Sequence, residues 1–172
     1  EQLVISHKVR LHEGQYRIPT PAEDDWETTR ASIQASPGDI NRLHSAVVTG
    51  LWEPRPSYSL EDAKTFKAGL TFNGRTVVDE DIRFNLSFAD VGDDFESSSA
   101  EARKRSQEDA KEVFWVASLD DRIERVTVEV HRSTEMLSRK ERGARTKDET
   151  ALVSEEKQRL NRNQGDLRRM LR

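Results

Sequence analysis

The sequence predicts an α+β fold, in which a small antiparallel sheet packs with helices and a C-terminal antiparallel helical hairpin follows. Apolar and polar residues alternate through residues 64–90, which is the period of strands. From Leu119 onward, apolar residues recur every three or four positions, which is the period of helices. Apolar residues make up 34% of the chain and charged residues 35%, so we expect a modest core and much solvated helix or loop.

The first expected element is a hairpin over residues 3–18. Alternating residues flank a turn at His12–Gln15. Pro19 and Pro21 end the hairpin, because proline has no N–H to donate to a strand ladder. Thr20 is then a candidate N-cap for the next helix, with Pro21 in the first helical position.

Two helices are expected next, over residues 22–35 and 39–52. Trp26 and Ile33 lie on one stripe of the first helix, together with Thr29 and Arg30. An apolar face at helical spacing marks the second helix and consists of Ile40, Leu43, Val47 and Leu51. Two prolines, Pro54 and Pro56, end this helix and begin an extended linker.

The antiparallel strands are expected within residues 64–90. Asn73-Gly74 predicts a two-residue hairpin turn, because both positions of that turn favour positive φ. Asp79–Asp81 is interpreted as a charged bend, after which alternation resumes at Ile82. We expect the sheet to pack with the helices of residues 22–52.

The segment after the strands is acidic and then rich in serine. It predicts a loop followed by a polar helix over residues 99–111. The apolar run Val113–Val116 predicts a strand buried on both faces.

Residues 119–172 predict the helical hairpin. In the first helix Ser133 fills a gap in an apolar seam made of Leu119, Ile123, Val126, Val130 and Leu137. Gly143 interrupts the pattern, and a second helix is expected from Lys147. Its weaker heptad places Lys157 and Gln164 in the seam beside Val153, Leu160 and Leu167.

These elements divide the chain into segments. We expect a hairpin over 1–21, two helices over 22–56, an antiparallel β-rich subdomain with a polar helix over 57–118, and the charged hairpin over 119–172. The chain starts at Glu1 without methionine and stops at Arg172 inside a helical pattern. We therefore expect it to be an internal piece of a longer protein.

Several classes of chemistry find no support in the residue pattern. The chain has no cysteine, no apolar run of membrane-helix length and no glycine-rich loop followed by Lys-Ser or Lys-Thr. The four histidines lack ligand spacing and are interpreted as surface or half-buried residues. His131 and Glu135 form a helical i,i+4 pair with no nucleophile beside them. We expect no catalytic residue, cofactor or metal in this segment, and a cytoplasmic location.

Two carboxylate clusters, Asp79–Asp81 and Asp90–Glu96, leave an enzymatic alternative open. Paired carboxylates can hold a divalent cation, but the second cluster lacks the spacing of a calcium loop. An enzyme would require both clusters to converge on one metal. We interpret them instead as solvated acidic loops.

Charge is unevenly distributed along the chain. Residues 121–172 carry 14 Lys/Arg and 10 Asp/Glu, whereas the chain as a whole has a net charge of −4. A basic stripe can bind phosphate backbones, so nucleic-acid contact is an alternative function. The candidate contact residues are Arg139, Lys140, Arg142, Arg145, Lys147, Arg159, Arg162, Arg168 and Arg169.

The order of several segments resembles one protein family. The segments are Tyr58–Leu70 ahead of a hairpin, Val113–Val116, His131–Met136 and Glu155–Leu160. Their order resembles the large P-loop ATPases of bacterial BREX phage-defence systems, the BrxC/PglY family. Residues Glu13–Pro21 look like the wing of a winged-helix module, also as in that family.

The resemblance implies a role and no site. The ATPase motifs of that family lie elsewhere in its polypeptide and are absent here, so no catalytic residue carries over. The implied role is that of a non-catalytic architectural or interaction segment of a phage-defence ATPase. Its expected partners are the remainder of its own polypeptide and other proteins of the defence system, with nucleic acid as the alternative and no membrane.

Overall fold

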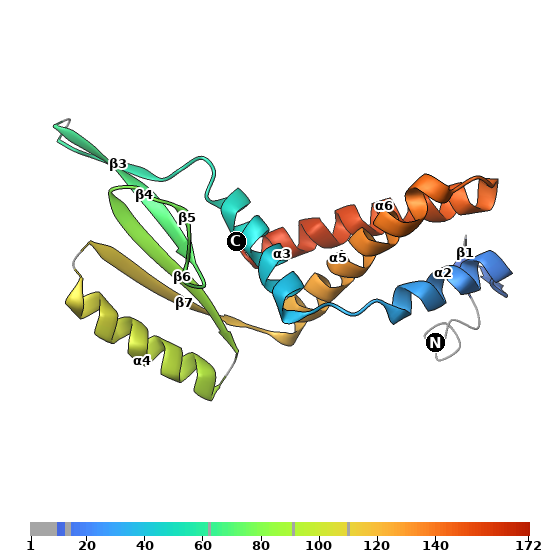
Figure 1. Ribbon diagram of the computed structural model, residues 1–172, viewed down its shortest axis with the longest axis horizontal. Helices are drawn as coiled ribbons and strands as arrows, with labels where there is room; N and C mark the ends of the chain where they lie inside the picture. The colour runs from blue at the N-terminus through green and yellow to red at the C-terminus, as the bar shows by residue number, and fades with distance from the viewer. Residues whose placement is uncertain (1–9, 13–14, 62, 91, 110) are drawn as a thin grey trace. The chain divides into compact units, whose positions relative to one another are not determined.

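The chain has the α+β class that the sequence predicts. The residues that the computed structural model describes are 10–12, 15–61, 63–90, 92–109 and 111–172. They form two compact units. The first unit combines the described residues up to Ile40 with Val126–Asp166, and the second combines Asn41–Arg125 with Leu167–Arg172. Figure 1 shows the elements in chain order.

Helices dominate the first unit. Its elements are β1 (Arg10–His12), β2 (Gln15–Arg17), α2 (Pro21–Ser32), most of α5 (Asp121–Lys140), the 3-10 turn η1 (Glu141–Gly143) and most of α6 (Lys147–Met170). Strands β1 and β2 pair antiparallel, which confirms the described part of the predicted hairpin. The predicted strand residues before Arg10 and the turn residues 13–14 lie outside the described residues.

A capping box starts α2. The Thr20 hydroxyl accepts a hydrogen bond from the Glu23 N–H, and the Glu23 carboxylate accepts one from the Thr20 N–H. These two bonds satisfy backbone donors that the first helical turn leaves without a partner. The N-cap predicted at Thr20 is confirmed.

The core of the first unit joins α2 to the helical hairpin. Its buried side chains are Trp26, Ile33, Met136, Leu137, Leu152 and Val153. Helices α5 and α6 run side by side there (Figure 1), and the start of α6 at Lys147 is as predicted. Within this unit, Trp26 and Ile33 are buried against the hairpin, so the predicted stripe of the helix faces α5 and α6.

Three predicted seam positions, Val126, Lys157 and Gln164, also differ from the prediction. Thr127 is fully buried, whereas Val126 is only half-buried. On α6, the side chains of Lys157 and Gln164 are exposed, and the buried position belongs to Glu156. A heptad pattern assigns seam positions from sequence spacing alone. Which side chains are buried depends also on the side from which the neighbouring helices pack.

The second unit contains the sheet. Its elements are most of α3 (Pro37–Leu51), then β3 (Ser57–Leu60), β4 (Lys64–Phe72), β5 (Arg75–Val78), β6 (Ile82–Asp90), α4 (Asp93–Glu108) and β7 (Glu112–Leu119). The strand order is β3-β4-β6-β7, and β5 also pairs with β4. Asn73 and Gly74 both have positive φ, which confirms the predicted hairpin turn between β4 and β5.

The sheet is mixed and not wholly antiparallel as predicted. Strands β3 and β5 pair antiparallel with β4, but β6 is parallel to β4 and β7 is parallel to β6. Helix α4 provides the crossover from β6 to β7, which parallel neighbours require. The return from β5 to β6 passes directly over Gly69, where a Cβ atom would lie 2.8 Å from the Glu80 nitrogen and from the Val78 oxygen. Only a residue without a side chain admits that crossing.

Two element boundaries and the burial of one strand differ from the sequence interpretation. Residues 57–60, expected as linker, form β3 with all four side chains exposed. Helix α4 begins at Asp93, because acidic residues suit the positive end of a helix as well as they suit a loop. The strand at Val113–Val116 is not buried on both faces, since Val113 is 42% and Trp115 66% exposed. Strand β7 lies at the end of the strand order, so fewer neighbours cover it.

Candidate functional site

The pleat of the second unit's sheet gives it an apolar face. In the paired register, Phe72, Leu86 and Trp115 stand in one row across β4, β6 and β7. Alternate residues of β6, Phe84 and Phe88, point to the same face. Helix α3 packs on this face through Val48, which is buried with Leu70 and Phe72.

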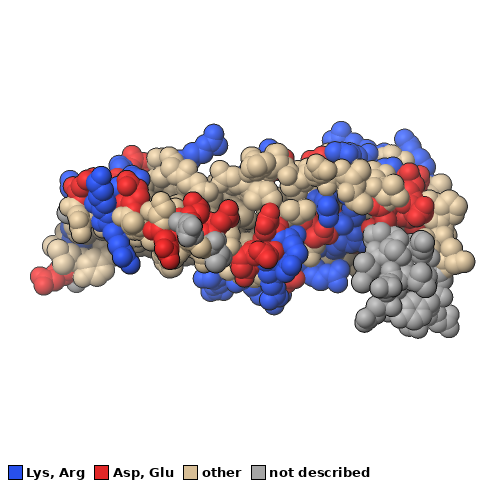
Figure 2. Space-filling view, turned by 90° about the horizontal axis from the view of Figure 1, so that it is seen from below, with Lys and Arg blue, Asp and Glu red and all other residues tan. Residues whose placement is uncertain are grey.

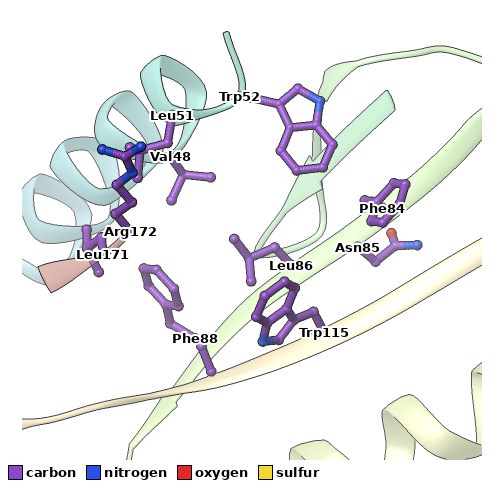
Figure 3. Close-up of a pocket in the computed structure, with 11 residues that line it drawn as sticks. Val48, Leu51, Trp52, Phe84, Asn85, Leu86, Phe88, Trp115, Leu171 and Arg172 are labelled. Atoms are coloured by element: carbon purple, nitrogen blue, oxygen red, sulfur yellow. The ribbon is translucent and has the colours of Figure 1, made fainter. Parts of the chain in front are cut away.

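Helix α3 leaves part of the apolar face open as a cleft. The cleft has a volume of about 290 Å³ and is shown in Figure 3. It lies among α3, the sheet and the end of the chain, with Leu51 and Trp52 on one side, Leu86 and Trp115 on the floor, and Leu171 near its edge. Its size and apolar lining are typical of a site for an apolar group.

Aromatic contacts hold the cleft walls in place. The Trp52 indole N–H donates to the Ala68 carbonyl oxygen at 3.1 Å, and its ring lies 5.4 Å from the Phe84 ring. Phe72 and Phe88 meet edge to face at 5.0 Å between centroids. Such pairs add orientation to simple burial, so the walls are formed without a ligand.

Trp115 is the exposed aromatic residue of this cleft. It retains 66% of its accessible surface, although its row on the sheet is otherwise apolar. Large aromatic side chains supply much of the binding energy at protein interfaces. An exposed indole beside an apolar cleft therefore indicates a contact surface.

The cleft also has polar groups in and near its lining. Asn85 lines it but donates its amide to Glu112 at 3.1 Å, and Arg172 contributes a guanidinium. His44, near the cleft, is 2% exposed and has its ring 5.4 Å from that of Phe88. Burial lowers the pKa of His44, so its imidazole is neutral at pH 7. The interpretation of all four histidines as surface or half-buried groups is wrong for His44 and also for His131, which is 8% exposed.

The structure separates the candidate nucleic-acid residues into two kinds. Arg139 pairs with Glu135 at 3.3 Å, Lys140 with Asp25 at 3.3 Å, and Arg159 with Glu27 at 3.1 Å. These cations are engaged in contacts within the first unit. By contrast, the set Arg142, Arg145, Lys147 and Arg162 is exposed and forms no ion pair with the described residues.

The last two candidates lie at the end of α6, in the second unit. Arg168 donates to the Gly50 carbonyl oxygen at 3.4 Å, and Arg169 is exposed on the same turn. In Figure 2 acidic and basic side chains are interspersed over the visible face. Around η1 and the start of α6, the basic residues likewise alternate with Glu141, Asp148 and Glu149.

The carboxylate clusters take part in local structure. The Asp81 carboxylate accepts from the Lys67 N–H at 3.0 Å, Glu80 pairs with Arg55 at 3.1 Å, and Asp94 accepts from the Asp90 N–H at 3.1 Å. Within the described ranges no three His, Asp or Glu residues converge as metal ligands. Asp79–Asp81 stabilises the crossing over Gly69 by these contacts.

A buried polar network in the first unit was not anticipated from the sequence. Glu156 is 1% exposed, and its carboxylate accepts from the Trp26 indole N–H and from Arg30, each at 3.1 Å. Arg30 also pairs with Glu129, which in turn pairs with Arg132. The only sequence signal was the placement of Arg30 on the apolar stripe of α2.

No protein-family model, curated protein or solved structure matches the chain. In the described part of the chain, no helix is both long enough and apolar enough to cross a membrane.

Proposed function

We propose that this chain is a non-catalytic interaction segment of a larger bacterial phage-defence ATPase, and that its cleft receives an apolar side chain of a partner protein. The observation that carries the proposal is Trp115, 66% exposed beside an apolar cleft of about 290 Å³. The Asn85 amide in its lining is engaged by Glu112, which favours binding over chemistry. The resemblance to BREX ATPases supports the larger setting.

Charge around the cleft specifies the partner. Arg172 lines the cleft, and Arg168 and Arg169 lie on the last turn of α6 in the same unit. Opposite charge steers association and selects partners more than it adds affinity. The partner segment therefore carries a large apolar anchor flanked by acidic residues.

A matched pair of peptides tests this binding mode. Two fluorescein-labelled helical peptides carry the same tryptophan and leucine anchors, one flanked by glutamate and the other by lysine. The fluorescence anisotropy of the glutamate peptide is expected to rise when this protein is added, and the rise should become smaller as the salt concentration increases. The variants Trp115→Lys and Arg172→Glu are expected to abolish and to weaken that response, respectively. Equal binding of both peptides, or binding that Trp115→Lys leaves intact, contradicts the proposal.

A plating assay tests the role in defence. Bacteria that express the full-length protein with its partner proteins are challenged with phage. Trp115→Lys is expected to reduce protection, whereas Tyr58→Lys, at a comparably exposed aromatic residue of β3, is expected to leave it unchanged. Full protection against phage by the Trp115→Lys variant would show that this cleft is not required for defence.

Nucleic-acid binding is a second candidate, favoured by the exposed cations without ion pairs. Arg142, Arg145 and Lys147 lie close together in the chain, at and after η1. Anisotropy of labelled duplex and single-stranded oligonucleotides across a salt series tests this. Binding that falls steeply with salt and is lost when these three residues become Glu supports it. Because these side chains are exposed and form no ion pair with the described residues, the triple variant is expected to fold normally.

A further inference from the structure

The opposite face of the sheet carries a polar hollow under α4. Thr71, Asn85 and Phe114 form one row across β4, β6 and β7, and Ser87 lies in the next row. Successive strand residues point to opposite faces, so Thr71, Ser87 and Phe114 face away from the apolar cleft, whereas Asn85 lies in the lining of both cavities. Together with α4 they line a cavity of about 270 Å³.

One hydroxyl at this cavity is buried without a hydrogen bond. Thr71 is only 7% exposed, and its Oγ1 has no partner among the described residues. Buried polar atoms in native proteins almost always form a hydrogen bond. A polar atom that loses its hydrogen bonds to water on burial, and gains none in return, costs free energy. An orphaned hydroxyl in the lining of a polar cavity indicates a group that arrives from outside.

Two opposite charges flank the hollow from α4. Glu101 and Arg105 lie four residues apart on the helix, and both line the cavity. The Arg105 guanidinium lies over the Phe114 ring, 4.7 Å from its centroid. Both side chains are exposed, and no ion pair joins the two in the part of the chain that the structure describes. Each charge is available to a ligand.

We propose that this hollow is a binding site for a small zwitterion of the α-amino acid class. The Glu101 carboxylate would accept from the ligand's ammonium group, and the Arg105 guanidinium would donate to its carboxylate. Thr71 and Ser87 would bond the ligand's polar side chain. An α-amino acid carries both charges on one carbon, which suits two charged residues on adjacent helical turns.

Calorimetric titration with three matched probes tests the ligand class. L-Serine carries both charges, ethanolamine lacks the carboxylate, and D-glycerate lacks the ammonium. Serine is expected to bind at concentrations up to about 10 mM and to raise the melting temperature in proportion to its occupancy. No serine binding in that range, or equal binding of ethanolamine or D-glycerate, overturns the proposal.

Variants locate the site. Thr71→Val removes the hydroxyl at nearly constant volume, and it is expected to abolish serine binding while leaving the free protein as stable or more stable. Thr76→Val, on the paired but exposed position of β5, is the matched control and should bind serine normally. Glu101→Gln and Arg105→Gln are each expected to weaken binding markedly. If Thr71→Val, or both charge variants, bind serine as the wild type does, serine binds outside this hollow and the proposed site is refuted.

Discussion

Glu156 connects two helices of the first unit through charge and hydrogen bonds. Its carboxylate is enclosed, and Trp26 and Arg30 donate to it from α2. A buried charge is tolerated only when its partners replace the water it has lost. The network therefore specifies how α2 packs on α6, in addition to the apolar contacts beside it.

Removing this carboxylate is expected to be costly. Glu156→Ala leaves the Arg30 charge without one of its two acceptors and the Trp26 N–H without a partner. The free energy of unfolding should fall by about 3 kcal/mol, measured by urea denaturation. Gln158→Ala, an exposed site on the same helix, serves as the control and should change stability by less than about 0.5 kcal/mol. Similar losses in both variants would show that the network contributes nothing specific.

The same residue makes stability dependent on acid. Burial raises the pKa of Glu156, but hydrogen bonds from neighbouring side chains and the charge of Arg159 outweigh it, so the pKa lies below its ordinary value of 4.5. A depressed pKa in the folded state stabilises the protein above the unfolded value, and this contribution disappears as pH falls through the folded value.

Urea unfolding between pH 7 and pH 3 checks this dependence. The wild-type protein should lose stability below about pH 4.5, and Glu156→Gln should lose less over the same range. The two stabilities should therefore converge in acid. A constant difference in stability between the two proteins at every pH would assign the acid sensitivity to other groups, such as Glu129. Burial raises the pKa of Glu129, but its contacts with Arg30 and Arg132 outweigh burial and lower the pKa below its ordinary value.

At the scale of elements, the crossing over Gly69 decides the sheet topology. The hairpin β4–β5 would allow an antiparallel meander, yet the chain returns across β4 and adds β6 on its other side. This path is open only because Gly69 presents no Cβ atom to the backbone at Val78–Glu80. The neighbour is backbone, which cannot turn aside as a side chain would.

Gly69→Ala is accordingly expected to destabilise the second unit. The added methyl group would meet two backbone atoms at 2.8 Å, so the crossing must shift. We expect a loss of about 2 kcal/mol or more in the free energy of unfolding. Gly50→Ala in α3 is the control, because nothing lies within 4 Å of its added Cβ and alanine favours a helix. Its melting temperature should rise slightly, and a comparable loss in both variants would contradict the steric explanation.

The seam of α5 offers a second test of an element. Val130 is 1% exposed, whereas Val126 is half-buried. Val130→Asp buries a charge without a partner and should cost several kcal/mol, on the order of 3 or more. Val126→Asp should cost distinctly less, because its side chain can reach water. Thermal melts followed by circular dichroism give both values, and equal costs would show that the two positions are equally enclosed.

At the scale of the molecule, dense charge coexists with exposed apolar surface at the cleft. Charged residues make up 35% of the chain, and the sequence pI is about 5.7. Against this background, Val113 and Trp115 form an apolar surface beside the cleft. Exposed apolar surface of this kind marks interaction sites and, without a partner, promotes self-association.

Trp115→Lys is therefore expected to reduce self-association of the isolated protein. Light scattering at rising concentration should increase less than for the wild type, with little change in melting temperature, because the side chain is 66% exposed. Tyr58→Lys, at a residue 64% exposed, should have a smaller effect on scattering. If the two substitutions act alike, exposed aromatic surface in general is responsible and the cleft is not.

Short-range sequence patterns were sufficient to predict many of the helices, strands and turns. The capping residues around Thr20, the Asn73-Gly74 turn, the start of α6 at Lys147 and the helical hairpin all follow from local chemistry, because a cap or a turn depends on a few adjacent residues. The α+β class follows from the two periods of apolar residues. The candidate cations were also identifiable, but the sequence could not show which of them form ion pairs.

The tertiary structure alone decided how these elements combine. Parallel pairing of β6, the exposure of Trp115 and the burial of Glu156 each depend on residues far apart in the chain. The cleft and the polar hollow exist for the same reason, since each is lined by several elements. The sequence by itself determined the type and approximate position of most helices and strands, because those preferences are local, although it missed β3 and the start of α4. Which face each one buries depends on the partner that folding brings to it.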